Sequence, residues 1–270
     1  MLDGLPYQLK LAIARKLPPF YIHTLGSSCS EWREILRSNQ RILSNRRALP
    51  GAGSAGGYDT FVPRFPSADT LRLYGNGIIN RQQSAAFDLS SLGAVGADGR
   101  GRPRIRNLLL SFCTFLPSTF RHLAACELTS LHLDTNSMRG VAGIAPTIGQ
   151  IGSLVSLRIR NNMIGSSAPE LARAIVGLTK LESLCLAQNE LGATGATALA
   201  PSLVVLARLR SLDLSRNLIA CDGATALATT LRALTALTEL NIDANAIGAQ
   251  GFAALDSRGP AGLAGLMGLR

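Results

Sequence analysis

The sequence contains none of the common catalytic signatures. It has no phosphate-binding P-loop, no His-Glu-x-x-His zinc motif and no Gly-x-Ser-x-Gly nucleophile motif. A Gly-x-Gly-x-x-Gly match at 51–56 follows no predicted strand and lies in a Pro/Gly/Ser-rich segment, so we interpret it as linker. The three histidines have no carboxylate or thiol at catalytic spacing. We therefore expect no enzyme activity, no cofactor and no small-molecule substrate.

Several other features are scarce. No run of 18 apolar residues is present, which excludes a membrane-spanning helix of ordinary length. The five cysteines are an odd number, at spacings that fit neither a disulfide framework nor a zinc site. The first residues lack the basic and apolar regions of a secretory signal. We therefore expect a cytoplasmic or nuclear protein, with no bound metal and no membrane partner.

The net charge of +10 is concentrated in the first part of the chain. Residues 1–106 hold 15 Lys/Arg against 7 Asp/Glu, whereas residues 107–270 hold 12 against 10. Part of the excess lies in the Gly- and Pro-containing segment Gly96–Arg104, which also lacks the aromatic residues that stack on bases. This pattern favours a solvated loop over a nucleic-acid partner.

A repeated motif dominates the rest of the chain. The pattern Leu-x-x-Leu-x-Leu/Ile-x-x-Asn-x-Ile/Leu/Met occurs five times, at intervals of 26, 27, 28 and 28 residues. A fixed period of this kind predicts one supersecondary unit stacked repeatedly, because a single unit cannot bury its apolar stripe alone. The asparagines of the five copies are Asn136, Asn162, Asn189, Asn217 and Asn245.

Each repeat predicts a strand followed by a helix. In the copy that ends at Asn217, Leu212 and Leu214 alternate with polar residues, as in a strand with one buried face. The following segment Gly223–Leu234 has leucines at helical spacing. Strand, helix and parallel strand form the crossover that parallel pairing requires. We expect the asparagine amides to satisfy backbone groups where each repeat turns away from its strand.

These residues resemble the leucine-rich repeat family, in the long-repeat subclass typified by ribonuclease inhibitor and the GTPase-activating protein of Ran. The resemblance implies an α/β solenoid shaped as a horseshoe, with a parallel sheet on the concave side and helices on the convex side. Weaker copies at Ala68–Ile78 and Ile105–Phe115 bring the number of expected strands to seven, with an insertion near residues 80–104. Leu266 and Leu269 fit the start of an eighth strand.

The N-terminal segment resembles an F-box. Leu5, Pro6, Leu9, Ile13 and Leu17 follow the family's spacing, and Cys29 and Trp32 follow further on. The resemblance implies that those first five residues contact a Skp-type adaptor. The segment departs from the family at Gln8, Tyr21 and Ser28, and a helical cap on the first repeat is the alternative. We expect an F-box-like helical module at residues 1–47 that includes Ile42 and Leu43, a linker at 48–66, and the repeats at 67–270.

The two best-preserved predicted helices share the hexapeptide Gly-Ala-Thr-Ala-Leu-Ala, at Gly195–Ala200 and Gly223–Ala228. It resembles the signature of the GALA repeat proteins, plant-pathogen effectors that join an F-box to leucine-rich repeats, and this resemblance implies the host cell cytoplasm as the location if the chain is a delivered effector. A simpler interpretation is that small residues are needed where each helix packs closely on a strand.

We expect binding to use outward side chains between the repeat leucines, which line up across successive strands. Three functions fit. The first is substrate recognition for an SCF-type cullin-RING ubiquitin ligase, with the adaptor and a protein substrate as partners. The others are a plain interaction module with a helical cap, and a GTPase regulator. The expected partner-binding residues are Arg72, Tyr74, His132, Asp134, Arg158, Arg160, Cys185, Asp213, Asn241 and Asp243.

Overall fold

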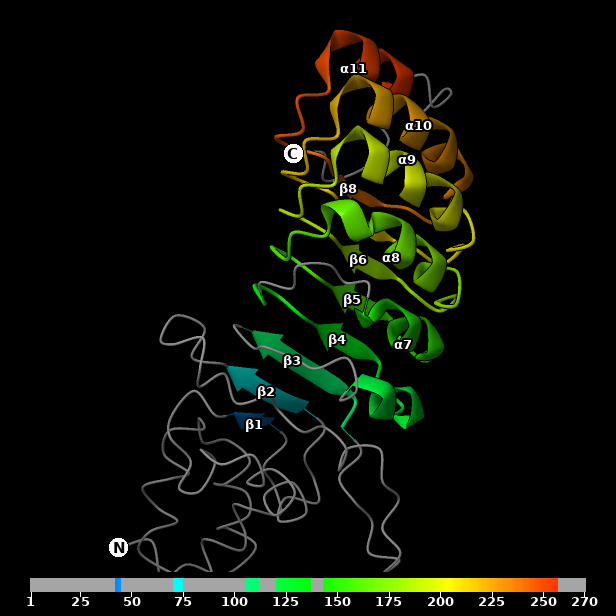
Figure 1. Ribbon diagram of the computed structural model, residues 1–270. Helices are drawn as coiled ribbons and strands as arrows, with labels where there is room; N and C mark the ends of the chain where they lie inside the picture. Colours follow the sequence, from blue (N-terminus) through cyan, green and yellow to red (C-terminus); the bar gives the residue numbers. More distant parts are fainter. Residues whose placement is uncertain (1–41, 45–69, 75–104, 112–119, 137–142, 257–270) are drawn as a thin grey trace, which may run out of the picture.

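The computed structural model describes residues 42–44, 70–74, 105–111, 120–136 and 143–256. Within these residues, eight strands form one parallel sheet whose strands follow one another in chain order (Figure 1). The solenoid expected from the repeats is therefore confirmed. The strands are β1 (Ile42–Ser44), β2 (Thr70–Tyr74), β3 (Asn107–Ser111), β4 (Ser130–His132), β5 (Ser156–Arg158), β6 (Ser183–Cys185), β7 (Ser211–Asp213) and β8 (Glu239–Asn241).

The leucines of the motif set the register of the sheet. Leu184 of β6 is paired with Leu157 of β5 on one side and with Leu212 of β7 on the other. Leu71, Leu108, Leu131 and Leu240 continue the same column, and every leucine in it from β2 to β8 is at most 2 % exposed. Since side chains alternate between the two faces of a strand, this column fixes which residues point away from the core. All seven predicted strands are present, as β2 to β8.

Helical segments cover one face of the sheet (Figure 1). Apolar residues of α8 that point inward, such as Leu171 and Ile175, are fully buried with the strand leucines in one continuous core. None of the helices in the described part of the chain is long and apolar enough to cross a membrane. The helical segments are η2 (Arg121–Ala125), α7 (Ala145–Gln150), η4 (Gly165–Ser167), α8 (Ala168–Ile175), α9 (Gly192–Leu203), α10 (Ala220–Ala233) and α11 (Gly248–Asp256).

Small residues let adjacent helices approach closely. A Cβ atom added to Gly223 of α10 would lie 2.7 Å from Ile219 Cγ2 and 3.0 Å from Ala196 Cβ of α9. The equivalent positions Gly195 and Gly251 are similarly crowded. The Gly-Ala-Thr-Ala-Leu-Ala pattern thus has a packing role, but the close neighbour is the preceding helix and not the strand expected from the sequence.

The motif asparagines form a buried column, as expected. All five are at most 5 % exposed. The backbone N–H of Asn189 donates to Oδ1 of Asn217 at 2.9 Å, and Asn217 N–H donates to Oδ1 of Asn245 at 2.8 Å. The side-chain amide of Asn217 donates to the carbonyl oxygens of Leu186 and Leu214. Asn136, Asn162, Asn189 and Asn217 thus each link their own turn to both neighbouring repeats, and Asn245 links its turn to the preceding repeat.

One expectation about the N-terminal region was wrong. Ile42 and Leu43 form β1, and Leu43 is paired with Leu71 of β2, whereas the sequence pattern placed both on the apolar side of a helical stretch. The pairing with β2 adds a strand that the leucine motif does not mark. Most of the F-box-like segment, including Leu5, Pro6, Leu9, Ile13 and Leu17, lies outside the described residues, as do the expected linker 48–66, the insertion 80–104 and the strand near Leu266.

Candidate functional site

The candidate site is the face of the sheet turned away from the helices, which we call the concave face. Along β7, Leu212 is buried between the half-buried Ser211 and Asp213, and the same alternation occurs in β3 to β6. The parallel register aligns the outward residues of neighbouring strands in rows. The central row is His132, Arg158, Cys185, Asp213 and Asn241.

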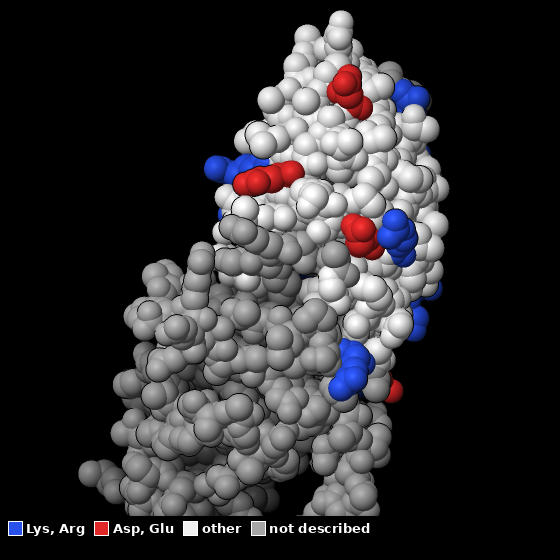
Figure 2. Space-filling view, viewed as in Figure 1, with Lys and Arg blue, Asp and Glu red and all other residues white. Residues whose placement is uncertain are grey.

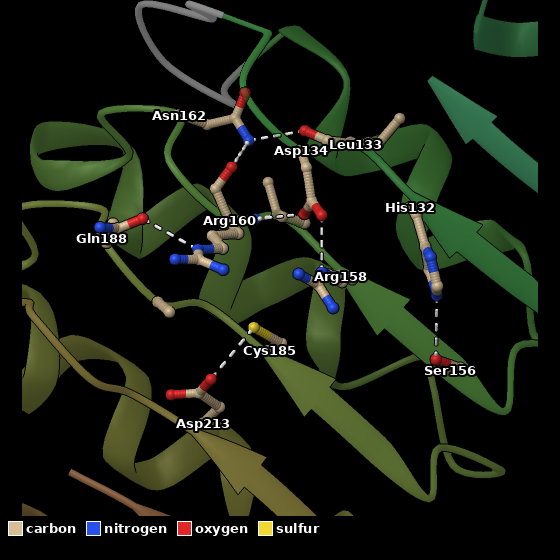
Figure 3. Close-up of polar contacts among 12 residues, drawn as sticks. His132, Leu133, Asp134, Ser156, Arg158, Arg160, Asn162, Cys185, Gln188 and Asp213 are labelled. Carbon is tan, nitrogen blue, oxygen red and sulfur yellow. Dashed lines mark hydrogen bonds and ion pairs between the residues drawn. The ribbon is translucent and has the colours of Figure 1, made fainter. Parts of the chain in front are cut away.

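Two arginines and one carboxylate form a network at the β4–β5 part of the concave face. The guanidinium Nε of Arg158 donates to Asp134 Oδ2 at 2.6 Å, and the backbone N–H of Arg160 donates to Asp134 Oδ1 at 3.0 Å. Arg160 Nε in turn donates to Gln188 Oε1 at 2.8 Å (Figure 3). The carboxylate of Asp134 thus binds the side chain of Arg158 and the backbone N–H of Arg160, both in the following repeat.

His132 lies beside two hydroxyl groups. Its Nε2 atom is 3.2 Å from Ser130 Oγ and 3.5 Å from Ser156 Oγ, and Figure 3 shows the ring directed at Ser156. Ser130 and Ser156 are themselves paired in register and are followed along the same row by Ser183 and Ser211. This row of hydroxyls gives one edge of the concave face an uncharged, hydrogen-bonding character.

Cys185 occupies the middle of the central row. Its Sγ donates to Asp213 Oδ2 at 3.5 Å, and Asp213 Oδ1 accepts the backbone N–H of Ser215. Burial raises the pKa of the Cys185 thiol to about 11, an effect that the neighbouring Asp213 charge reinforces and the Arg158 charge opposes. A thiol with such a pKa is protonated at neutral pH, so Cys185 is a hydrogen-bond donor to the carboxylate and a poor nucleophile.

The β7–β8 part of the concave face is acidic. Glu239 is in register with Ser211, Asn241 is in register with Asp213, and Asp243 follows the buried Ile242 on the same side. Asp243 donates its backbone N–H to Asn241 Oδ1 at 3.1 Å. Glu239 and Asp243 are exposed, and within the described residues no ion pair is formed by Asp213, Glu239 or Asp243.

The structure unites most of the expected binding residues on this one face. It joins Asp134, Arg158 and Arg160 in the network described above and places Cys185 against Asp213. Arg72 and Tyr74 lie in β2, where only their backbone is described. Gln188, which accepts a hydrogen bond from Arg160, was not predicted from the sequence. Its position immediately before the motif asparagine could have been recognised by comparing equivalent positions of the repeats.

Metal binding has no support in this region. Among the described residues, no group of three or more His, Cys, Asp or Glu side chains could hold a metal ion. The polar side chains of the concave face instead contact one another across neighbouring strands, which holds them in fixed positions.

Comparison with known proteins identifies the repeats. A protein-family model described as "Leucine Rich repeat" matches residues 177–200 and 208–228. These matches cover most of α9 and of α10 together with the strands β6 and β7. No curated protein sequence matches the chain significantly.

A solved structure shows the same fold. The leucine-rich repeat-containing protein LegL7 from Legionella pneumophila superposes with a TM-score of 0.51 and 21 % identity, over 88 % of this chain and 74 % of that one. An internalin (inlF) from Listeria monocytogenes matches with a TM-score of 0.36 and 13 % identity, over 100 % of this chain and 98 % of that one, a similarity too low to support an argument. The chain therefore contains leucine-rich repeats in a leucine-rich-repeat fold.

Proposed function

We propose that this chain is a protein-recognition module whose concave face binds a partner protein. The observation that carries the proposal is the continuous row His132, Arg158, Cys185, Asp213 and Asn241, together with the charged residues on either side of it. A buried leucine column holds these side chains in fixed register, so a partner meets a preorganised surface and little conformational freedom is lost on binding.

The dimensions of the sheet suit a protein partner. Neighbouring strands lie about 4.8 Å apart, so eight strands extend over about 34 Å. An α-helix of about 20 residues has a similar length, because each residue adds about 1.5 Å. The sheet is therefore long enough to contact a whole secondary-structure element of another protein.

We further propose that the segment containing Leu5, Pro6, Leu9, Ile13 and Leu17 docks a Skp-type adaptor, which would make the chain the substrate-recognition subunit of a cullin-RING ubiquitin ligase. The support is the F-box-like spacing of these residues together with a following repeat fold that offers a recognition surface. Tethering alone would then promote the reaction, since it raises the effective concentration of substrate lysines near the ubiquitin carrier.

The alternative is that the repeats bind a partner and the N-terminal helices only cap the stack. Both proposals use the concave face in the same way, and they differ in whether an adaptor binds. No feature of the described residues favours the third expectation, regulation of a GTPase.

Two uncharged substitutions test recognition by the concave face. Ser215 lies on that face beside Asp213, and Thr194 lies exposed on α9 on the helical side. Partners captured by the full chain are measured by quantitative mass spectrometry. We expect Ser215→Trp to remove a set of proteins that the wild type and Thr194→Trp both retain. Equal capture by all three proteins would contradict the proposal.

A second pair of variants tests adaptor binding. The double substitution Leu5→Ala with Pro6→Ala is combined with purified Skp-type adaptor, and complex formation is followed by size-exclusion chromatography. We expect the wild type and Ser215→Trp to bind and the double variant to fail. If the double variant binds as well as the wild type, or if the wild type does not bind, the adaptor proposal is wrong and the plain interaction module remains.

A further inference from the structure

The charges of the concave face change sign along the solenoid. Near β5, Arg158 is neutralised by its ion pair with Asp134, which leaves Arg160 as the uncompensated cation; its guanidinium contacts only the neutral amide of Gln188 among the described residues. Near β7 and β8, Asp213, Glu239 and Asp243 add three negative charges, against one from the exposed Arg216. The face therefore carries about +1 at one end and about −2 at the other.

The residues between these ends carry no charge. On β6, Ser183 and Cys185 are uncharged, and the raised pKa of the Cys185 thiol keeps it neutral. The two charged ends are thus separated by a neutral strand and do not cancel each other. Arg160 and Asp243 occupy equivalent positions three strands apart, which corresponds to about 14 Å at about 4.8 Å per strand.

The charges are also distributed across the width of the face. Glu239 lies in the first row, Asp213 in the central row, and Arg160 and Asp243 in the third row. The first and third rows are four residues apart along a strand, or about 13 Å at about 3.3 Å per residue. An α-helix with its side chains is about 10–12 Å wide and reaches across most of the 13 Å between the first and third rows, whereas an extended chain lies along one of them.

Resting on the proposed function, we propose that the partner presents an α-helix that lies across strands β5 to β8. One acidic residue of this helix faces Arg160, and two or three Lys or Arg residues seven, eight and eleven positions away, on the same side of the helix, face Asp213, Glu239 and Asp243. At about 1.5 Å per residue these positions lie about 10–16 Å from the acidic residue, which brackets the 14 Å between the charged ends. The charge order fixes which end of the helix lies over β8 and excludes partners with the opposite order. The net negative end also disfavours nucleic acid.

Designed helical peptides test this inference. The matched peptide is an alanine-based helix of about 20 residues with one Glu and three Lys, the Lys placed seven, eight and eleven positions from the Glu so that all four lie on one side of the helix. The control has the same composition with the Glu placed within the Lys group. Binding to the full chain is measured by fluorescence anisotropy at low ionic strength. We expect the matched peptide to bind more tightly than the control, with an affinity that falls as salt is added.

Substitutions assign the contacts. Glu239→Gln and Asp243→Asn should each weaken binding of the matched peptide roughly two- to fivefold, as for exposed ion pairs. Arg160→Gln should remove the preference for the matched peptide over the control. Glu170→Gln on α8 and Asp222→Asn on α10 remove carboxylates from the helical side and should change neither affinity.

Equal affinity for the two peptides, or no measurable binding of either, would overturn the inference. So would a loss of affinity in Glu170→Gln and Asp222→Asn as large as that in Glu239→Gln and Asp243→Asn. Self-association of the wild type that Glu239→Gln and Asp243→Asn abolish would also overturn it, since a second copy would then be the occupant. If Ser215→Trp abolishes partner capture while the charge variants retain it, recognition by the concave face stands and the helix assignment fails.

Discussion

The backbone N–H of Asn217 donates to Oδ1 of Asn245 in the next repeat at 2.8 Å, and its own Oδ1 accepts the N–H of Asn189 from the repeat before. Asn217, by its side chain and its backbone, thus connects three consecutive repeats. The fold depends on these contacts because each turn after a strand leaves buried backbone groups that need partners. The same contacts hold the strands in the register that aligns the concave face.

Asn217→Ala is expected to destabilise the protein by about 2–4 kcal/mol, because it leaves buried backbone groups of its own and the preceding repeat without partners. Urea unfolding followed by circular dichroism measures the change. The matched control is Asn241→Ala, whose half-buried side chain accepts one local bond from Asp243 and which should cost about 1 kcal/mol or less. Equal destabilisation by the two substitutions would contradict a structural role for the asparagine column.

Gly223→Ala is expected to destabilise the protein by about 1–3 kcal/mol through overpacking between α9 and α10. The better helix propensity of alanine offsets at most about 1 kcal/mol of this. Thr229→Ala, at an exposed position of the same helix, serves as control and should be close to neutral. A stabilised Gly223→Ala variant would show that the close approach of the helices is not needed.

Thr230→Val is expected to cost about 1 kcal/mol, because the buried Thr230 hydroxyl donates to the carbonyl oxygen of Ala200 at 2.9 Å and joins α10 to α9. Valine keeps nearly the same shape, so the change isolates the hydrogen bond. Thermal unfolding of Thr230→Val is compared with that of Thr229→Val, which alters an exposed hydroxyl on the same helix. Identical melting temperatures for the two variants would disprove this assignment.

Cys185 gives a prediction about pH. Its pKa is raised from 9.0 to about 11, so the thiol is protonated in the folded protein and already ionised in the unfolded chain between these two values. The folding free energy due to this group is therefore present below about pH 9 and is lost as the pH rises to about 11. Cys185→Ser should lose less stability than the wild type over this interval.

Alkylation of Cys185 by iodoacetamide, followed by peptide mass spectrometry, reports the same pKa directly. Its rate should still be rising above pH 10, and Asp213→Asn should move the midpoint to lower pH because a nearby negative charge is removed. A rate that is already constant at pH 9 would show that the thiol is not held protonated.

The sequence alone predicted the strand–helix units and the strand order, because both follow from a leucine pattern of fixed period. The asparagine column followed from the same pattern, since an amide that both donates and accepts suits a repeated turn. β1 was not predicted, because Ile42–Ser44 is a three-residue strand without the leucine motif and its only signal is pairing with β2.

The candidate surface was predicted in position but not in its contacts. Alternation along a strand indicates that Arg158 and Asp213 face outward, but the neutralisation of Arg158 by Asp134 depends on the register of two strands and on rotamers. The sequence pattern did not distinguish the two arginines as binding residues. In the structure Arg158 forms an ion pair with Asp134, whereas the Arg160 side chain contacts the neutral amide of Gln188. Likewise, the burial of the Cys185 thiol depends on neighbours from adjacent repeats.

Site-specific photo-crosslinking tests the central claim most directly. A benzoyl-phenylalanine is placed either at Ser183, in the middle of the concave face on β6, or at Thr194 on α9. After irradiation in cells, we predict that the Ser183 position yields an adduct with a partner protein and that the Thr194 position does not yield that adduct. The same partner attached through Thr194 and not through Ser183 would show that the helical side is the recognition surface, and would contradict the account.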